Sequence, residues 1–298
     1  MSFVATLIAP KLSRAQVDHA WYILEHVAGA QPKWNWRWLD EGAAADLAFV
    51  RNDNPDFVPL DALRRELPGV DIVVQSQANR AKRLLVADMD STMITVECID
   101  ELADYAGLKP EIAAITERAM RGELDFEAAL DARVALLEGL DAGVIDRCLA
   151  ERVRIMPGAE TLVRTMRARG GRCVLVSGGF TRFAEPVAQQ IGFDRAIANV
   201  LEIADGRLTG RVAKPIVGAA TKLQTLRAEA AALGIGLEQT LAVGDGANDL
   251  PMVQAAGLGV AYRAKPIVAA AAGARVEHGD LTALLWAQGI AKKDWVLS

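Results

Sequence analysis

Four short apolar runs, each ending in polar or glycine residues, constrain the fold of this 298-residue chain more than any other feature. Segments with helical spacing lie between the runs, for example at residues 159–169 and 221–233. Strands that are almost wholly apolar and alternate with helices indicate a parallel sheet covered on both faces. The sequence therefore predicts a doubly wound α/β sheet built on the runs LLVADMD from Leu84, CVLVSGG from Cys173, TLAVGDGAND from Thr240 and LGVAY from Leu258.

Two stretches interrupt this alternation. About residues 94–153 carry helical patterns with almost no strand signal, and they are too long for a simple crossover between two strands. We predict that they form a helical cap inserted over the sheet. Residues 198–213 hold Asp205-Gly206 between two β-prone runs, which is typical of a β-hairpin.

The first eighty residues have a pattern of their own. Strand-like segments at 3–9, 33–39, 45–51 and 70–75 and helix-like segments at 14–27 and 59–67 follow each other in the order β-α-β-β-α-β. That order is typical of a ferredoxin-like α+β sandwich. The polar, basic segment 77–83 is the expected linker, which divides the chain into domains at 1–78 and 79–298.

Trp34, Trp36 and Trp38 alternate with polar residues in the second of these strands. A stripe of aromatic side chains on one face of a strand can serve as a platform for a ligand. Such a stripe more often packs against helices or forms an interface, and we favour that interpretation.

Composition excludes several classes of function. The net charge is −5 and no run of Lys or Arg is present, so we expect no nucleic-acid partner. No apolar stretch reaches the length needed to cross a membrane, and no signal peptide is recognisable. Three cysteines without a CxxC pair suggest neither a disulfide framework nor a zinc site. A cytoplasmic protein with no membrane partner is expected.

Asp88 and Asp90 follow the first predicted strand, and residues i and i+2 of a strand point to the same side. Two carboxylates this close stay ionised together only when a cation is bound beside them. Without a cation, one of them holds a proton. Phosphoryl transfer uses both solutions, because a metal ion lets Asp88 approach an anionic phosphate while Asp90 protonates the leaving oxygen. Taken alone, an Asp-x-Asp pair more often caps a turn or helix.

Asp245 and Asp249 follow the third predicted strand and supply a second acidic pair at the same edge of the sheet. Hard oxygen ligands from separate strand ends suit Mg²⁺, which binds few protein carboxylates. Gly244 and Gly246 leave room for the backbone to approach an ion. The sequence thus predicts a magnesium site, although a Gly-Asp-Gly triplet by itself is an ordinary turn.

Ser177 ends the second strand and is followed by two glycines, so its hydroxyl and the neighbouring amides form a small anion cradle. Lys222 lies near the start of the helix before the third strand, where an ammonium also favours phosphate. Ser177 could instead be a nucleophile, but no GxSxG motif surrounds it. The only histidines have no placement that suggests a base for it: His19, His26 and His278.

Taken together, DMDST at 88–92, Ser177, Lys222 and GDGAND at 244–249 resemble the four motifs of the haloacid dehalogenase-like phosphohydrolase superfamily. The resemblance covers about residue 84 to the C-terminus. The longer strings DMDSTMITVECIDELA and MRGELDFEAALDARVALLEGL, with VSGGF and AVGDGANDLPM, are similar to the phosphoserine phosphatase family within it. This resemblance implies a Mg²⁺-dependent hydrolysis of O-phospho-L-serine, the last step of serine biosynthesis.

The resemblance also implies a role for each matched residue. Asp88 is expected to be the nucleophile and Asp90 the general acid and base. Mg²⁺ is expected on Asp88, the carbonyl of Asp90 and Asp245, with Asp249 supporting them. The phosphoryl group is expected on Ser177, the Gly178 amide and Lys222, with Asn248 at the substrate or beside Lys222, and the serine moiety on Glu97 and Arg133.

The last two assignments have a physical basis as well. Phosphoserine carries one cationic and one anionic group besides its phosphate, so a carboxylate and a guanidinium matched to them distinguish it from a plain phosphoester. Without the surrounding strings, Glu97 and Arg133 are more simply explained as members of surface ion pairs.

Three alternatives stay open at this point. The same scaffold could transfer the phosphoryl group to an acceptor such as homoserine, or hydrolyse another small phosphomonoester. A binding protein or amino-acid sensor with a vestigial core is a third, although the intact motifs oppose it. The N-terminal unit is similar to amino-acid-sensing regulatory domains, but it has no glycine-rich ligand turn, so a homodimer or docking role is an equal alternative.

Overall fold

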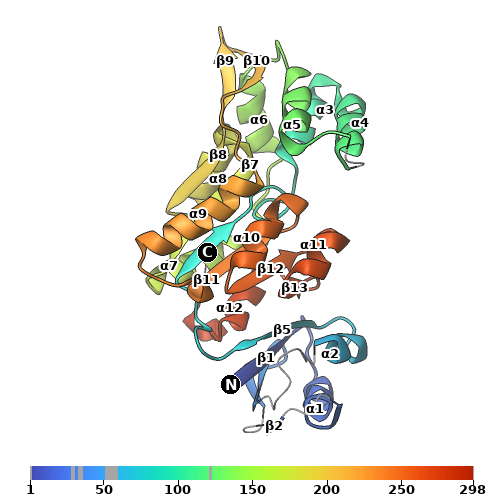
Figure 1. Ribbon diagram of the computed structural model, residues 1–298, viewed down its shortest axis with the longest axis vertical. Coiled ribbons are helices and arrows are strands. Elements are labelled where there is room, and N and C mark those ends of the chain that lie inside the picture. The colour runs from blue at the N-terminus through green and yellow to red at the C-terminus, as the bar shows by residue number, and fades with distance from the viewer. Residues whose placement is uncertain (1, 28–30, 33–35, 51–59, 121–122, 298) are drawn as a thin grey trace.

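The computed structural model describes residues 2–27, 31–32, 36–50, 60–120 and 123–297. Two sheets organise these residues, an antiparallel one near the N-terminus and a six-stranded parallel one, and a two-stranded hairpin stands apart from both (Figure 1). The predicted doubly wound sheet with a helical insertion and a preceding small α+β unit is confirmed. The predicted domain boundary stays a prediction.

The N-terminal sheet has the order β2-β4-β1-β5, and β3 also pairs with β4. One face of this sheet packs on two helices around a buried cluster that includes Leu7, Leu47 and Ile72. The first helix begins at a capping box, in which the Ser13 hydroxyl accepts from the Gln16 amide at 3.2 Å. The elements are β1 Ser2–Ile8, α1 Arg14–Tyr22, a π-helical turn Ile23–Val27, β2 Gln31–Pro32, β3 Arg37–Asp40, β4 Ala44–Val50, α2 Leu60–Glu66 and β5 Asp71–Ser76.

Trp36 and Trp38 contact each other edge to face and pack partly buried against this cluster. That placement agrees with packing rather than with an open ligand platform. Trp34 lies outside the described residues.

The six-stranded sheet has the order β13-β12-β11-β6-β7-β8, and every pair in it is parallel. Helices cover both faces (Figure 1). Its strands are β6 Leu84–Ala87, β7 Arg172–Phe180, β8 Arg195–Asn199, β11 Thr240–Gly244, β12 Leu258–Tyr262 and β13 Ala274–Val276. Its helices are α7 Ala159–Ala168, α8 Thr181–Ile191, α9 Ala219–Ala232, α10 Leu250–Ala255, α11 Pro266–Ala271 and α12 Ala283–Ala287.

The cap consists of four helices between β6 and β7: α3 Cys98–Ala106, α4 Lys109–Met120, α5 Phe126–Ala135 and α6 Gly143–Glu151. It joins the sheet through a narrow neck, where Ile94 forms an antiparallel bridge with Ile155. The hairpin β9 Leu201–Ala204 and β10 Arg207–Val212 reaches the loop between α5 and α6. There Gly139 donates to the Leu208 carbonyl at 2.8 Å.

The second face of the N-terminal sheet lies on the C-terminal part of the parallel-sheet unit. Arg80 spans this contact and donates to both carboxylate oxygens of Asp46, at 2.7 and 2.6 Å. Its Nε donates to the Ala287 carbonyl of α12 at 2.9 Å. The carboxylate of Asp71 accepts the backbone amides of residues 277, 278 and 279. Two buried carboxylates thus tie the two sheets together.

None of the helices within the described ranges is long and apolar enough to cross a membrane. The three cysteines, Cys98, Cys148 and Cys173, are free and buried.

Candidate active site

The polar residues singled out by the sequence follow three adjacent strands. β6 pairs with β11 on one side and with β7 on the other, so the carboxyl ends of these strands lie next to one another. Asp88 follows β6, Ser177 lies near the end of β7 and Asp245 follows β11. Ligands bind at this edge of an open α/β sheet.

A buried ion cluster occupies the centre of this edge. The Lys222 Nζ lies 2.6 Å from an oxygen of Asp88 and 2.6 Å from an oxygen of Asp249. Lys222 and Asp249 are fully buried, at 0% exposure. Burial alone would lower the pKa of Lys222, but the two carboxylates outweigh it and raise that pKa. Lys222 therefore stays an ammonium that is bound between two acids.

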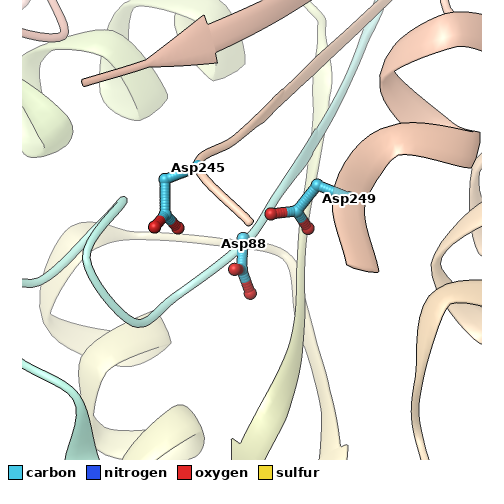
Figure 2. A group of neighbouring side chains, drawn as sticks. All are labelled: Asp88, Asp245 and Asp249. Carbon is cyan, nitrogen blue, oxygen red and sulfur yellow. The ribbon is translucent and has the colours of Figure 1, made fainter. Parts of the chain in front are cut away.

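Asp88, Asp245 and Asp249 each offer an oxygen within 4.8 Å of the others (Figure 2). Burial raises the pKa of Asp88 well above its ordinary value, and the negative charge of Asp249 raises it further, against the opposing effect of Lys222. Burial followed by Asp249 raises the pKa of Asp245 to about 6. Within this cluster three carboxylates meet one ammonium, so negative charge is in excess and a cation would relieve it.

Thr92 fixes the orientation of Asp245, because its hydroxyl donates to Asp245 Oδ1 at 3.2 Å. The Asp249 carboxylate is fixed on its other side by the Gly246 amide, which donates to it at 3.0 Å. Both acids are thus held by their own neighbours before any ligand arrives.

Asp90 lies at the edge of the cluster and has a different environment. Burial, followed by the charge of Glu97, raises its pKa to about 7. Its Oδ1 accepts weakly from the Cys98 amide at 3.4 Å. A carboxyl with a pKa near neutrality can both donate and accept a proton at physiological pH.

The segment Ser177-Gly178-Gly179 belongs to the last part of β7, where the pairing with β8 shifts register, and it lies beside these acids. The Gly179 amide donates to the Ser177 Oγ at 2.8 Å. A Cβ atom on Gly179 would lie 2.9 Å from Asp90 Oδ2, and one on Gly178 would lie 3.1 Å from the Phe126 ring of the cap. Glycine at both positions lets the backbone approach the acids and the cap closely.

A cavity of about 500 Å³ lies between the strand ends and the cap. Glu97 and Arg133 reach it from the cap. Ser91 donates to Glu97 Oε1 at 2.7 Å, and it does so from a left-handed backbone with a φ of 54°. Burial lowers the pKa of Arg133, although Asp100, Glu97 and Asp90 oppose that shift.

The geometry brings nearly all of the expected site residues to this cavity. Its lining includes Asp88, Asp90, Glu97, Arg133, Ser177, Gly178, Asp245 and Asn248. Lys222 and Asp249 are instead buried behind it, bonded to each other.

Several residues of the site were not predicted from the sequence, among them Thr92, Phe126 and Lys265. Phe126 and Lys265 line the cavity, and Thr92 bonds Asp245. Thr92 could have been found from its position in the DMDST string. Phe126 likewise lies in the string MRGELDFEAALDARVALLEGL, whereas Lys265 belongs to no motif and gives no comparable signal.

The fold and this carboxylate cluster define a class of doubly wound α/β proteins that have a cap inserted after the first core strand and aspartates at the strand ends. The model of the haloacid dehalogenase-like hydrolase family matches residues 85–254, more than half of the chain, and the chain belongs to that family.

Within the family the chain is similar to proteins named phosphoserine phosphatase. It is 53% identical over 228 residues to the one from Streptomyces coelicolor, a match that covers 76% of this chain and 55% of the relative. It is 49% identical over 208 residues to the one from Albidiferax ferrireducens, covering 68% of this chain and 88% of the relative. The chain thus spans about half the length of the Streptomyces relative.

Solved structures show the same likeness. An HAD family hydrolase from Salmonella enterica serovar Typhi superposes with a TM-score of 0.83 at 31% identity, covering 96% of this chain and 97% of that one. A probable phosphoserine phosphatase from Vibrio cholerae superposes with a TM-score of 0.76 at 34% identity, covering 100% and 89%.

Proposed function

We propose that the protein hydrolyses O-phospho-L-serine to L-serine and phosphate, with Asp88 as the nucleophile. One observation carries this proposal: a single cavity holds a carboxylate cluster, an anion cradle and a carboxylate–guanidinium pair. The first two suit a phosphoryl group and the third suits the two charged groups of an amino acid. The names of the relatives support the same substrate.

The reaction would proceed in two displacements at phosphorus. Asp88 attacks the phosphorus and forms a phosphoaspartate, while the ester bond breaks and the serine oxygen takes a proton from Asp90. Water then attacks the phosphorus of the phosphoaspartate and gives a proton to Asp90. This step releases phosphate and restores the Asp88 carboxylate and the protonated Asp90. The pKa of Asp90, raised to about 7, suits it to both proton transfers.

We propose Mg²⁺ as the cofactor. The donor set fits it, because three aspartates offer oxygens within 4.8 Å of one another and carry excess negative charge. Asp88, the carbonyl of Asp90 and Asp245 would hold the ion, and Asp249 would support them. When bound, the ion neutralises charge between the nucleophile and the phosphate.

The remaining residues would bind and orient the substrate. Ser177, the Gly178 amide and Lys222 would hold the phosphoryl oxygens, and Lys222 would do so from behind the cavity lining, 2.6 Å from the proposed nucleophile. Glu97 would bind the ammonium of the substrate and Arg133 its carboxylate. Asn248 would contact the substrate at the cavity wall.

A panel of three esters tests the substrate assignment. O-phosphoserine has both charged groups, O-phosphoethanolamine lacks the carboxylate, and 2-hydroxy-3-phosphopropanoate has a hydroxyl in place of the ammonium. Phosphate release should be fastest with O-phosphoserine and should stop when a chelator removes the metal. Faster hydrolysis of either analogue would refute the proposed substrate.

Two cap variants sharpen the test. Glu97→Gln should narrow the preference for O-phosphoserine over the hydroxy acid, and Arg133→Met should narrow its preference over O-phosphoethanolamine. Equal losses on every ester would contradict both assignments.

Adding an alcohol acceptor and analysing the products separates hydrolysis from phosphoryl transfer.

A cytoplasmic location and a homodimer through the N-terminal region remain proposals. The free, buried cysteines support a reducing compartment. Sedimentation of the whole chain would test the dimer.

A further inference from the structure

Asn199 is a buried amide at the end of β8, and the proposed chemistry does not use it. It is 2% exposed and its side chain makes three hydrogen bonds to backbone groups. Nδ2 donates to the Gly178 carbonyl at 2.8 Å and to the Val217 carbonyl at 3.2 Å, and Oδ1 accepts from the Val217 amide at 2.7 Å. A single side chain therefore joins two segments that border the phosphoryl site.

The bond to Gly178 acts on the anion cradle through one peptide group. The carbonyl of Gly178 and the amide of Gly179 belong to the same planar peptide. The carbonyl end accepts from Asn199, and the amide end donates to the Ser177 Oγ at 2.8 Å. A chain of two hydrogen bonds thus runs from the amide of Asn199 to the hydroxyl of Ser177, and bonds in such a chain strengthen each other.

The bonds to Val217 act on a second segment beside the site. Val217 immediately precedes Gly218, the N-cap residue of α9, and α9 carries Lys222. A Cβ atom on Gly218 would lie 3.3 Å from the Phe126 ring, which also touches the Cβ position of Gly178. The two segments bonded by Asn199 therefore both pack against Phe126, so the distance between them affects the shape of the cavity that Phe126 lines.

We propose that Asn199 is a positioning residue that sets the anion cradle, by orienting the Gly178–Gly179 peptide and with it the Ser177 hydroxyl. This inference rests on the proposed role of Ser177 and Gly178 in binding the phosphoryl group. Asn199 touches no substrate itself. Its loss weakens the binding of the phosphate group and leaves the choice between amino-acid and other esters unchanged, because Glu97 and Arg133 lie elsewhere on the cavity wall.

Asn199→Asp is the variant that tests this proposal. A carboxylate of the same shape can still accept from the Val217 amide, but it repels the carbonyls of Gly178 and Val217. The inhibition constant of inorganic phosphate should rise about tenfold, the size expected when buried polar groups lose their partners. KM should rise by a similar factor for every ester that the parent enzyme hydrolyses.

Gln288→Glu is the matched control. Gln288 is also a buried amide, its Nε2 donates to the Leu284 carbonyl at 3.0 Å, and its Oε1 accepts from the Lys82 amide at 3.0 Å. The same chemical change there should lower stability in urea without changing the inhibition constant of phosphate. If Asn199→Asp also loses only stability, Asn199 is structural and the proposal fails.

Asn199→Ser keeps the test decisive if the aspartate variant does not fold. Its short hydroxyl cannot reach Gly178 and Val217 together, so phosphate inhibition should again weaken, and an unchanged constant would overturn the proposal. Inhibition by phosphate can be followed with any hydrolysed ester. Failure of the parent enzyme on O-phosphoserine would therefore refute the proposed function and leave this inference standing.

Discussion

Two clusters of buried ionised side chains, one between the two sheets and one at the strand ends of the parallel sheet, differ in their balance of charge. Between the sheets, the carboxylate of Asp46 meets the guanidinium of Arg80, which also donates to the Thr6 hydroxyl and to the carbonyls of Trp286 and Ala287. At the strand ends, the ammonium of Lys222 meets the carboxylates of Asp88 and Asp249, and Asp245 lies beside them.

The first cluster is complete within the chain. The one acid has Arg80 as its main partner, and the Arg80 guanidinium has protein acceptors on its three nitrogens. The second cluster has three carboxylates for one ammonium, and burial, followed by the charge of Asp249, raises the pKa values of Asp88 and Asp245. Burial of charge alone therefore does not mark a functional site, whereas an uncompensated buried charge does.

Asp88→Asn should give the largest effect and should separate the two clusters most clearly. Loss of the proposed nucleophile should lower kcat on the order of 10⁴-fold. Stability in urea should hold or rise, because the substitution removes one of the crowded negative charges. Rates of phosphate release and a urea unfolding curve measure both. Near-normal turnover would exclude Asp88 as the nucleophile.

Arg80→Met should show the opposite pattern. It leaves the Asp46 carboxylate buried without its main partner, and such losses cost about 3–5 kcal/mol. Turnover of the folded enzyme should change little. Arg37→Met serves as the control, because Arg37 contacts the same carboxylate at 3.3 Å from a side chain that is 59% exposed. Its removal should cost about 1 kcal/mol or less. Equal losses of stability in both variants would mean that the mostly buried Arg80 stabilises the protein no more than the exposed Arg37 does.

Adding Mg²⁺ should stabilise the folded protein through the second cluster alone. At an ion concentration of 100 times Kd the gain is about 2.7 kcal/mol. Asp245→Asn should reduce this gain and Arg80→Met should keep it. Urea unfolding with Mg²⁺ or with a chelator measures the difference. If the Asp245→Asn variant keeps the full gain in stability, Mg²⁺ binds at another site.

The smallest effect concerns pH in the presence of a chelator. The folded pKa values of Asp245, about 6, and Asp90, about 7, lie above the ordinary value of 3.8. The folded state thus binds more protons in this window, so the contribution of these groups to stability is complete below about 4 and is lost as pH rises through 6 and 7. Asp90→Asn should flatten the decline in melting temperature between pH 5 and 8. An unchanged slope would contradict the raised pKa of Asp90.

The sequence predicted the architecture well where strands are buried on both faces. The runs at β6, β7, β11 and β12 stand out because parallel strands in the middle of a sheet are almost wholly apolar. The edge strands β8 and β13 were not predicted. β13 has only three residues, and β8 begins with Arg195 and is mostly half-buried, so neither has a distinctive pattern.

The candidate site was predictable only as far as sequence order determines which strand ends meet. Strand ends in a parallel sheet meet at one edge, so the convergence of Asp88, Ser177 and Asp245 followed from sequence order. The bond from Thr92 to Asp245 and the partners of Asn199 did not follow from it, because they depend on side-chain rotamers and on loops that only the folded chain defines. The pair formed by Asp46 and Arg80 has no local signature, since its members lie 34 residues apart.

The carboxylate of Asp71 has a consequence for any shortened version of this chain. It occupies a row of three amides at residues 277–279, at distances from 2.7 to 3.2 Å. A protein cut before residue 80 would present those amides to solvent with no internal acceptor. Water or a dissolved anion, such as chloride or sulfate, would then accept from these amides, and the stability of the truncated protein should rise with added salt more than that of the whole chain.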